Sequence, residues 1–157
     1  MKKKKILWTT DLHLNFLTTE KIKLFIQEIM SKSPDALLIG GDIGEATSTC
    51  FYLQKLEQSI KCPIYFVLGN HDYYKGSLSK VKKDVCQLTN SSKKLFFLDT
   101  IPFVGLNKDT ALIGQGGWAD GRFGNYDDSE VILNDYVLID DFVGLNKNQR
   151  LKKLNKL

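Results

Sequence analysis

The chain has 157 residues, of which 43% are hydrophobic and 25% charged, as is ordinary for a single globular domain with its own core. Its apolar runs are all shorter than the ~18 residues that a membrane-spanning helix needs. The run behind the N-terminal lysines is too short for a secretion signal and is interrupted by Asp11 and His13. We therefore expect a cytoplasmic protein with no membrane partner.

The net charge of +4 is unevenly distributed along the chain. Nine of the 22 basic residues lie in segments 2–5 and 146–157, which leaves 13 basic against 18 acidic residues between them. Because a nucleic-acid site needs a basic patch with aromatic residues on the folded body, we expect no nucleic-acid partner. The three cysteines have no C-x-x-C spacing, and we interpret them as reduced thiols.

Strand-like apolar segments alternate with segments of helical periodicity in the first half of the chain. The alternation predicts an α/β fold in which right-handed crossovers join parallel strands. In the first helix, Ile22, Ile26 and Ile29 fall at the spacing of one buried face. The predicted strands span residues 4–10, 36–39 and 64–68, and the predicted helices span 19–32, 47–59 and 79–88.

The pattern changes after residue 94. A turn at 107–109 between two short apolar segments predicts an antiparallel hairpin. No internal repeat or linker divides the chain, so we expect one domain over residues 1–157. The predicted elements of this half are strands at 95–98, 101–106 and 111–113, an irregular glycine-rich loop at 115–125, and helices at 131–142 and 146–157.

Polar side chains follow each of the three strands of the first half. Since the carboxyl ends of parallel strands meet at one edge, where open sheets bind ligands, these side chains should lie together. The first two motifs are also common in loops and turns, whereas the third is more specific, because buried polar groups need partners. The three motifs are Asp11-Leu12-His13, Gly41-Asp42 and Gly69-Asn70-His71-Asp72.

These residues supply oxygen and nitrogen ligands and no sulfur, a set that suits Mn²⁺, Fe, Zn²⁺ or Mg²⁺ without choosing among them. Asp42 could bridge two ions. Two ions about 3.5–4 Å apart clamp the attacking and leaving oxygens of a phosphoryl displacement and activate a bound water. The set therefore predicts two divalent ions and a phosphoester substrate.

The three motifs resemble the D-x-H, G-D and G-N-H-[DE] motifs of the calcineurin-like metallophosphoesterase family. The resemblance implies a β-sandwich flanked by helices. It also implies that His71 is the catalytic acid that protonates the leaving oxygen, with Asp72 as its carboxylate partner. The implied metal ligands are Asp11, His13 and Asp42 for one ion, and Asp42 with Asn70 for the second.

The sequence departs from the family in its second half. The family completes the site with a later histidine and a G-H-x-H motif, whereas this chain has no histidine after His71. It therefore resembles a family domain truncated at its C-terminus, with an incomplete second sheet. The apolar strands would then lack cover on one face, and we expect a homo-oligomer formed through this exposed sheet face.

Two functions are consistent with these features. The first is metal-dependent hydrolysis of phosphomonoesters or phosphodiesters through a two-metal site and a metal-bound water. The alternative is a catalytically impaired remnant of the fold that acts as a binding or interaction module. The number of bound ions separates the two, because a remnant would hold one ion or none.

Overall fold

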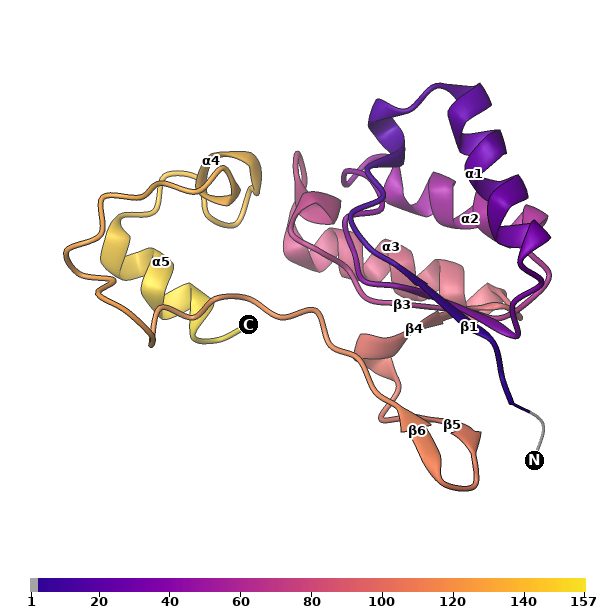
Figure 1. Cartoon of the computed structure of the whole chain (residues 1–157). Helices are drawn as coiled ribbons and strands as arrows, with labels where there is room; N and C mark the ends of the chain where they lie inside the picture. The colour runs from indigo at the N-terminus through magenta and orange to yellow at the C-terminus, as the bar shows by residue number, and fades with distance from the viewer. Residues whose placement is uncertain (1–2) are drawn as a thin grey trace.

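The computed structural model describes residues 3–157 and shows a four-stranded parallel sheet with three helices over one face (Figure 1). The predicted α/β fold with parallel strands is thereby confirmed. The strands lie side by side in chain order as β1 (Ile6–Thr9), β2 (Ala36–Ile39), β3 (Ile64–Phe66) and β4 (Leu95–Phe97). The covering helices are α1 (Thr19–Ser31), α2 (Thr49–Ser59) and α3 (Leu78–Ser91).

Helices α1 and α3 begin at capping hydroxyls. The side chain of Thr18 accepts a hydrogen bond from the backbone N–H of Lys21, and Ser77 accepts one from Lys80. Such caps satisfy backbone donors that the first turn of a helix leaves free. In α2, which has no such cap, Leu53 and Leu56 are fully buried against the sheet. Its stability therefore depends on packing.

All three helices cover the same face because every connection steps to the next strand in the same direction. Right-handed crossovers that all step the same way place their helices on one side of a sheet. On that side Leu37, Ile64 and Leu95 lie in register and are buried.

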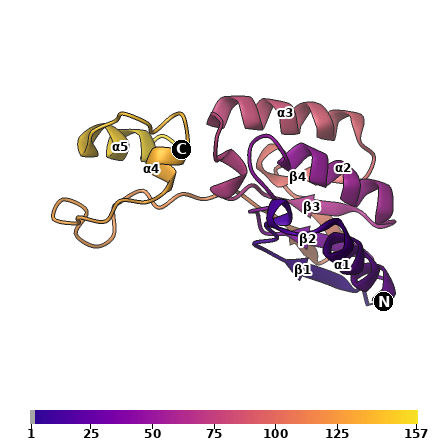
Figure 2. The same cartoon turned by 90° about the horizontal axis from the view of Figure 1, so that it is seen from above.

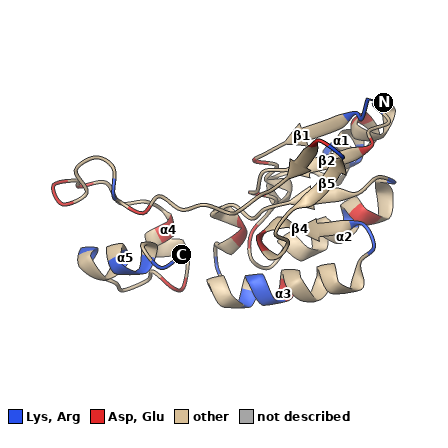
Figure 3. Cartoon of the chain, turned by 90° about the horizontal axis from the view of Figure 1, so that it is seen from below, with Lys and Arg blue, Asp and Glu red and all other residues tan. Residues whose placement is uncertain are grey.

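The opposite face of the sheet carries an apolar row that is exposed at Trp8 and half-buried at its other three residues. Trp8 is 74% exposed. Tyr65 and Phe96 stack with ring centroids 5.0 Å apart. No residue of β1 to β4 is charged. In Figure 3 blue is seen on helices such as α3 and α5, in loops and near the N-terminus. The residues in register across the four strands are Trp8, Leu38, Tyr65 and Phe96.

The segment after α3 differs in part from its prediction. Residues 95–97 form β4, which pairs parallel to β3. The incomplete second sheet that the resemblance implies therefore does not begin at this strand, because α3 returns the chain to the open edge of the first sheet. The predicted antiparallel hairpin is confirmed as β5 (Val104–Asn107) and β6 (Thr110–Leu112).

The helix predicted over residues 131–142 is also wrong, since only one turn forms, α4 (Asp135–Leu138). The segment instead runs beside residues 75–78, to which it is hydrogen-bonded. These long-range hydrogen bonds outweigh the helical pattern, because the apolar residues of the segment are only loosely in phase for a helix. The bonds join Lys75 N to Leu138 O (2.7 Å), Asp140 N to Gly76 O (3.1 Å) and Leu78 N to Asp141 Oδ2 (2.7 Å).

The last helix, α5 (Lys147–Leu154), begins at a capping box formed by Asn146 and Gln149 and confirms the prediction for this segment. It lies near the start of α3 (Figure 2) and does not cover the apolar row of the sheet. Cys50, Cys62 and Cys86 are free thiols. No helix within residues 3–157 is both long and apolar enough to cross a bilayer.

Candidate metal centre

The loops after β1 and β2 are joined by backbone hydrogen bonds at the carboxyl edge of the sheet. The amide of Asp11 donates to Gly41 O (3.1 Å), and the amide of His13 donates to Asp42 O (2.8 Å). The side chains of the first two motifs are therefore held next to one another by the main chain. This is the convergence at one edge that the parallel strands predict.

Three of the candidate ligands have left-handed backbone conformations. The φ angles are 53° for Asp11, 43° for His13 and 54° for Asp42. A non-glycine residue in this region costs of order 1–3 kcal/mol, and such residues concentrate at binding and catalytic sites. The five described non-glycine residues with positive φ thus include three candidate ligands. This distribution supports a functional site at the sheet edge.

Two glycines allow the loops after β2 and β3 to approach each other. Gly41 has φ +98°, and a Cβ there would lie 2.5 Å from Gly69 N. A Cβ on Gly69 would lie 2.1 Å from Asp42 Oδ1. Only glycine fits at either position without displacing its neighbours. The Asp42 carboxylate therefore lies against bare backbone.

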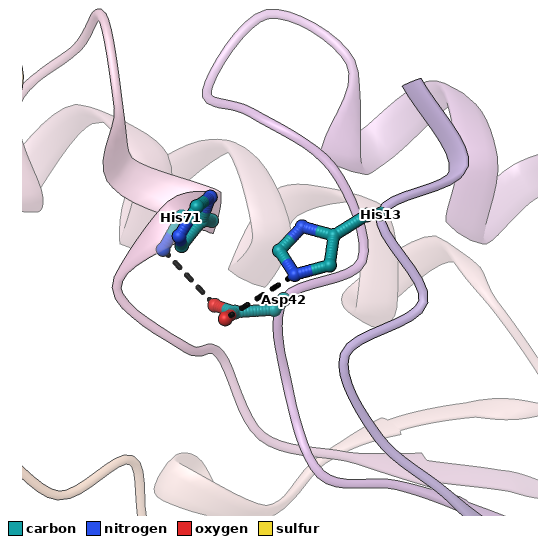
Figure 4. Close-up of side chains that lie close together, drawn as sticks. All are labelled: His13, Asp42 and His71. Atoms are coloured by element: carbon teal, nitrogen blue, oxygen red, sulfur yellow. Dashed lines mark hydrogen bonds and ion pairs between the residues drawn. The ribbon is translucent and has the colours of Figure 1, made fainter. Parts of the chain in front are cut away.

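Asp42 lies between the two histidines of the chain (Figure 4). Its Oδ1 accepts a hydrogen bond from the backbone amide of His71 (3.0 Å), and its Oδ2 lies 3.9 Å from His13 Nε2. The imidazole rings meet edge to face with centroids 4.6 Å apart. One ligand atom from each of these three side chains lies within 4.8 Å of the others.

The geometry of this cluster fits a metal ion better than a hydrogen bond. A separation of 3.9 Å is too long for a hydrogen bond. Two ligand atoms that each bind one ion at about 2.1 Å lie roughly 3–4 Å apart. His13 Nδ1 is also buried without a hydrogen-bond partner among residues 3–157, a cost that a bound ligand would partly offset. The donors present therefore fit a divalent cation.

A second group of candidates lines a cavity of about 390 Å³ to which Asp42 also contributes. Asp11 is exposed there, and its Oδ2 accepts a hydrogen bond from Thr10 Oγ1 (2.6 Å). Asn70 and Asp42 line the same cavity. Asp42 is thus the one candidate ligand that belongs both to the histidine cluster and to the cavity wall.

Asp72 is fully buried and its carboxylate accepts four hydrogen bonds, none of them from His71. Burial raises the pKa of the Asp72 carboxyl, and several of these donors oppose that shift. The bonds tie the loop after β2 to the loop after β3 and so fix the third motif. The donors are the amides of Ile43, Gly44 and Gly69 and the hydroxyl of Thr49.

Asp135 is a site residue that the sequence analysis missed. Its Oδ1 accepts hydrogen bonds from Asn70 Nδ2 (2.8 Å) and Tyr74 OH (2.8 Å), and it lines the cavity. A signal was present, because Asp135 precedes the fully buried Ile139 and Phe142 by four and seven residues. A carboxylate at that spacing lies on the apolar face of the predicted helix and needs a buried partner.

The glycine-rich loop forms another part of the cavity wall through residues 115–119. Trp118 packs between Tyr73 and Phe142, with centroid distances of 6.0 and 5.7 Å. Phe123 is 97% exposed. Trp118 is therefore a packing residue that holds the loop against the site.

The sequence matches the calcineurin-like phosphoesterase family over residues 4–154, which is nearly the whole chain. No curated protein matches the chain significantly. The matched range includes all three motifs and Asp135.

Proposed function

The chain belongs to the calcineurin-like phosphoesterase family, a family of metal-dependent hydrolases, and from this premise we propose that it hydrolyses phosphomonoesters or phosphodiesters at a two-metal site. The observation that carries the proposal is that Asp42 belongs both to the histidine cluster and to the wall of the cavity that Asp11 and Asn70 line. A carboxylate has two oxygens with about four lone-pair sites and can therefore serve more than one partner. The proposed function therefore depends on Asp42 as a ligand that both metal ions share.

In this proposal His13, Asp11 and Asp42 hold one divalent ion, and Asp42 and Asn70 hold the second. The ions supply Lewis acidity and lower the pKa of a bound water. The His71 imidazole belongs to the same cluster, since its ligand atom lies within 4.8 Å of those of His13 and Asp42.

We propose that the His71 imidazole donates the proton that the leaving oxygen takes up. Its ring is held on one side by Tyr74, stacked at 4.2 Å, and by the edge contact with His13 on another. Asp72 contributes by fixing the backbone of the motif, since its carboxylate is occupied by the loop donors. A fixed ring is the condition for efficient general acid catalysis.

Activity of the chain with Mn²⁺ tests this function. We expect slow hydrolysis of p-nitrophenyl phosphate or its bis-ester, barely above background, because both histidines of the chain are already used and few ligands remain for two ions. His71→Ala should abolish the Mn²⁺-dependent part. The control is Asp84→Asn, which changes a surface partner of Lys80 far from the motifs. Turnover that His71→Ala leaves intact would contradict the assignment.

The second candidate function, an interaction module, is favoured by the apolar row on the open sheet face. Exposed apolar patches above a few hundred Å² usually mark an interface. The row contains no charge that would oppose contact with a second copy of the chain. We propose that this face joins two copies.

Sedimentation at micromolar concentration tests self-association. Trp8→Lys should shift the chain toward monomer by at least about tenfold in dissociation constant, since it removes a large exposed apolar group and adds charge. The matched control is Phe51→Lys, which changes an aromatic side chain that is 57% exposed on α2. A parent chain that sediments as a clean monomer and binds no hydrophobic dye would rule out this role of the face.

A further inference from the structure

Asp135 is a buried carboxylate without a basic partner. It is 8% exposed, and none of the ion pairs within residues 3–157 includes it. Burying a charge is costly unless hydrogen bonds compensate. Its Oδ1 accepts hydrogen bonds from the side chains of Asn70 and Tyr74. The carboxylate is therefore directed at Asn70, a residue of the third motif.

The carboxylate determines which way the Asn70 amide faces. An ionised carboxylate only accepts hydrogen bonds, so the amide must present its NH₂ group to Asp135. The second amide hydrogen is directed at Tyr74 OH, 3.1 Å away. Both donors of Asn70 are then used, and its carbonyl Oδ1 is the atom left for another ligand. Divalent cations bind this oxygen and not the nitrogen.

Tyr74 strengthens the arrangement. Its hydroxyl donates a hydrogen bond to Asp135 Oδ1 (2.8 Å). The same ring stacks on His71. One buried carboxylate is thus bonded to two residues that orient the third motif.

The backbone holds Asp135 in this position. The chain that follows it forms a parallel bridge between Gly76 and Ile139, and Leu138 O accepts from Lys75 N. Ile139 and Phe142 are fully buried. Because the backbone next to Asp135 is already fixed, its side chain loses little conformational entropy when it contacts Asn70.

We propose that Asp135 is a positioning residue, which sets the orientation of the Asn70 amide so that Oδ1 faces the second metal ion. The inference rests on the proposed two-metal function. It assigns a role to a residue outside the three motifs, 65 positions from its partner in the sequence.

Calorimetric titration of the full chain with Mn²⁺ tests the proposal. Asp135→Ala should weaken the second ion roughly 10–100-fold and leave the first within about threefold. The nearly isosteric Asp135→Asn should lose much less, because its amide oxygen still accepts the bonds from Asn70 and Tyr74. Combined with Asn70→Ala, Asp135→Ala should add no further loss, because Asp135 acts through Asn70. The control is Asp140→Ala, which removes an exposed carboxylate from the same segment.

The outcomes separate this inference from the proposed function. Parent-like binding of both ions by Asp135→Ala overturns the inference alone. So does a loss that adds fully to that of Asn70→Ala, since a merely structural residue would behave in that way. Failure of the parent chain to bind Mn²⁺ overturns the two-metal function and, with it, the inference. Circular dichroism of Asp135→Ala shows whether the variant is folded.

Discussion

Asp42→Asn should remove most of the divalent metal that the chain binds, and more than Asn70→Ala removes. Asp42 is the candidate that lies both in the histidine cluster and in the cavity wall, so its loss weakens both ions. Loss of one ligand or its support commonly costs 10–100-fold in affinity, and a bridging ligand incurs that cost twice. Metal analysis of the purified variants after dialysis measures the difference.

The hydrogen bonds around Asp42 make this substitution more damaging than the loss of charge alone. The backbone amide of His71 needs an acceptor, so an asparagine at position 42 would turn its carbonyl oxygen toward that amide. Its NH₂ group would then face His13 Nε2, where a metal ion needs an acceptor. A donor in that position repels a cation.

Asp84→Asn is the matched control for this prediction. It makes the same carboxylate-to-amide change in α3, in a surface ion pair with Lys80. Such pairs contribute little to stability, so metal content should equal that of the parent. Equal metal in Asp42→Asn and the parent chain would show that Asp42 is not a shared ligand.

The parts of the fold that the sequence predicted depend on local patterns. Strands β1 to β3, helices α1 to α3 and the hairpin follow from apolar periodicity and turn residues, which act over a few positions. The three motifs could be placed together for the same reason. Each follows a strand of one parallel sheet, and the topology alone brings those strand ends to one edge.

The parts that the sequence did not predict depend on contacts between distant residues. Asp135 meets Asn70 across 65 positions, and α4 is shortened because its segment pairs with residues 75–78. The left-handed backbone conformation of Asp42 could not be predicted from the sequence either, because aspartate seldom adopts it unless its surroundings impose it. Such features follow from the assembled fold and leave little trace in local periodicity.

Gly69→Ala should both destabilise the chain and release its metal. An alanine Cβ at this position would lie 2.1 Å from Asp42 Oδ1 and 2.8 Å from Asp42 N. The carboxylate must move, and so must its bond to the His71 amide. Overpacking of this kind costs about 1–3 kcal/mol, which corresponds to a fall in melting temperature of roughly 2–12 °C at this chain length. Thermal unfolding and metal analysis of the same sample measure the two effects.

Gly105→Ala is the control, since a Cβ there would meet no atom within 4 Å. It should keep the parent melting temperature within about 2 °C, because surface substitutions usually change stability by less than 0.5 kcal/mol. Gly69 suits the test better than Gly41, whose positive φ would add backbone strain to the steric effect. A Gly69→Ala chain with parent stability and parent metal content would mean that the Asp42 carboxylate does not bind metal in the position against Gly69. Loss of metal with little loss of stability would locate the effect at the ligand itself.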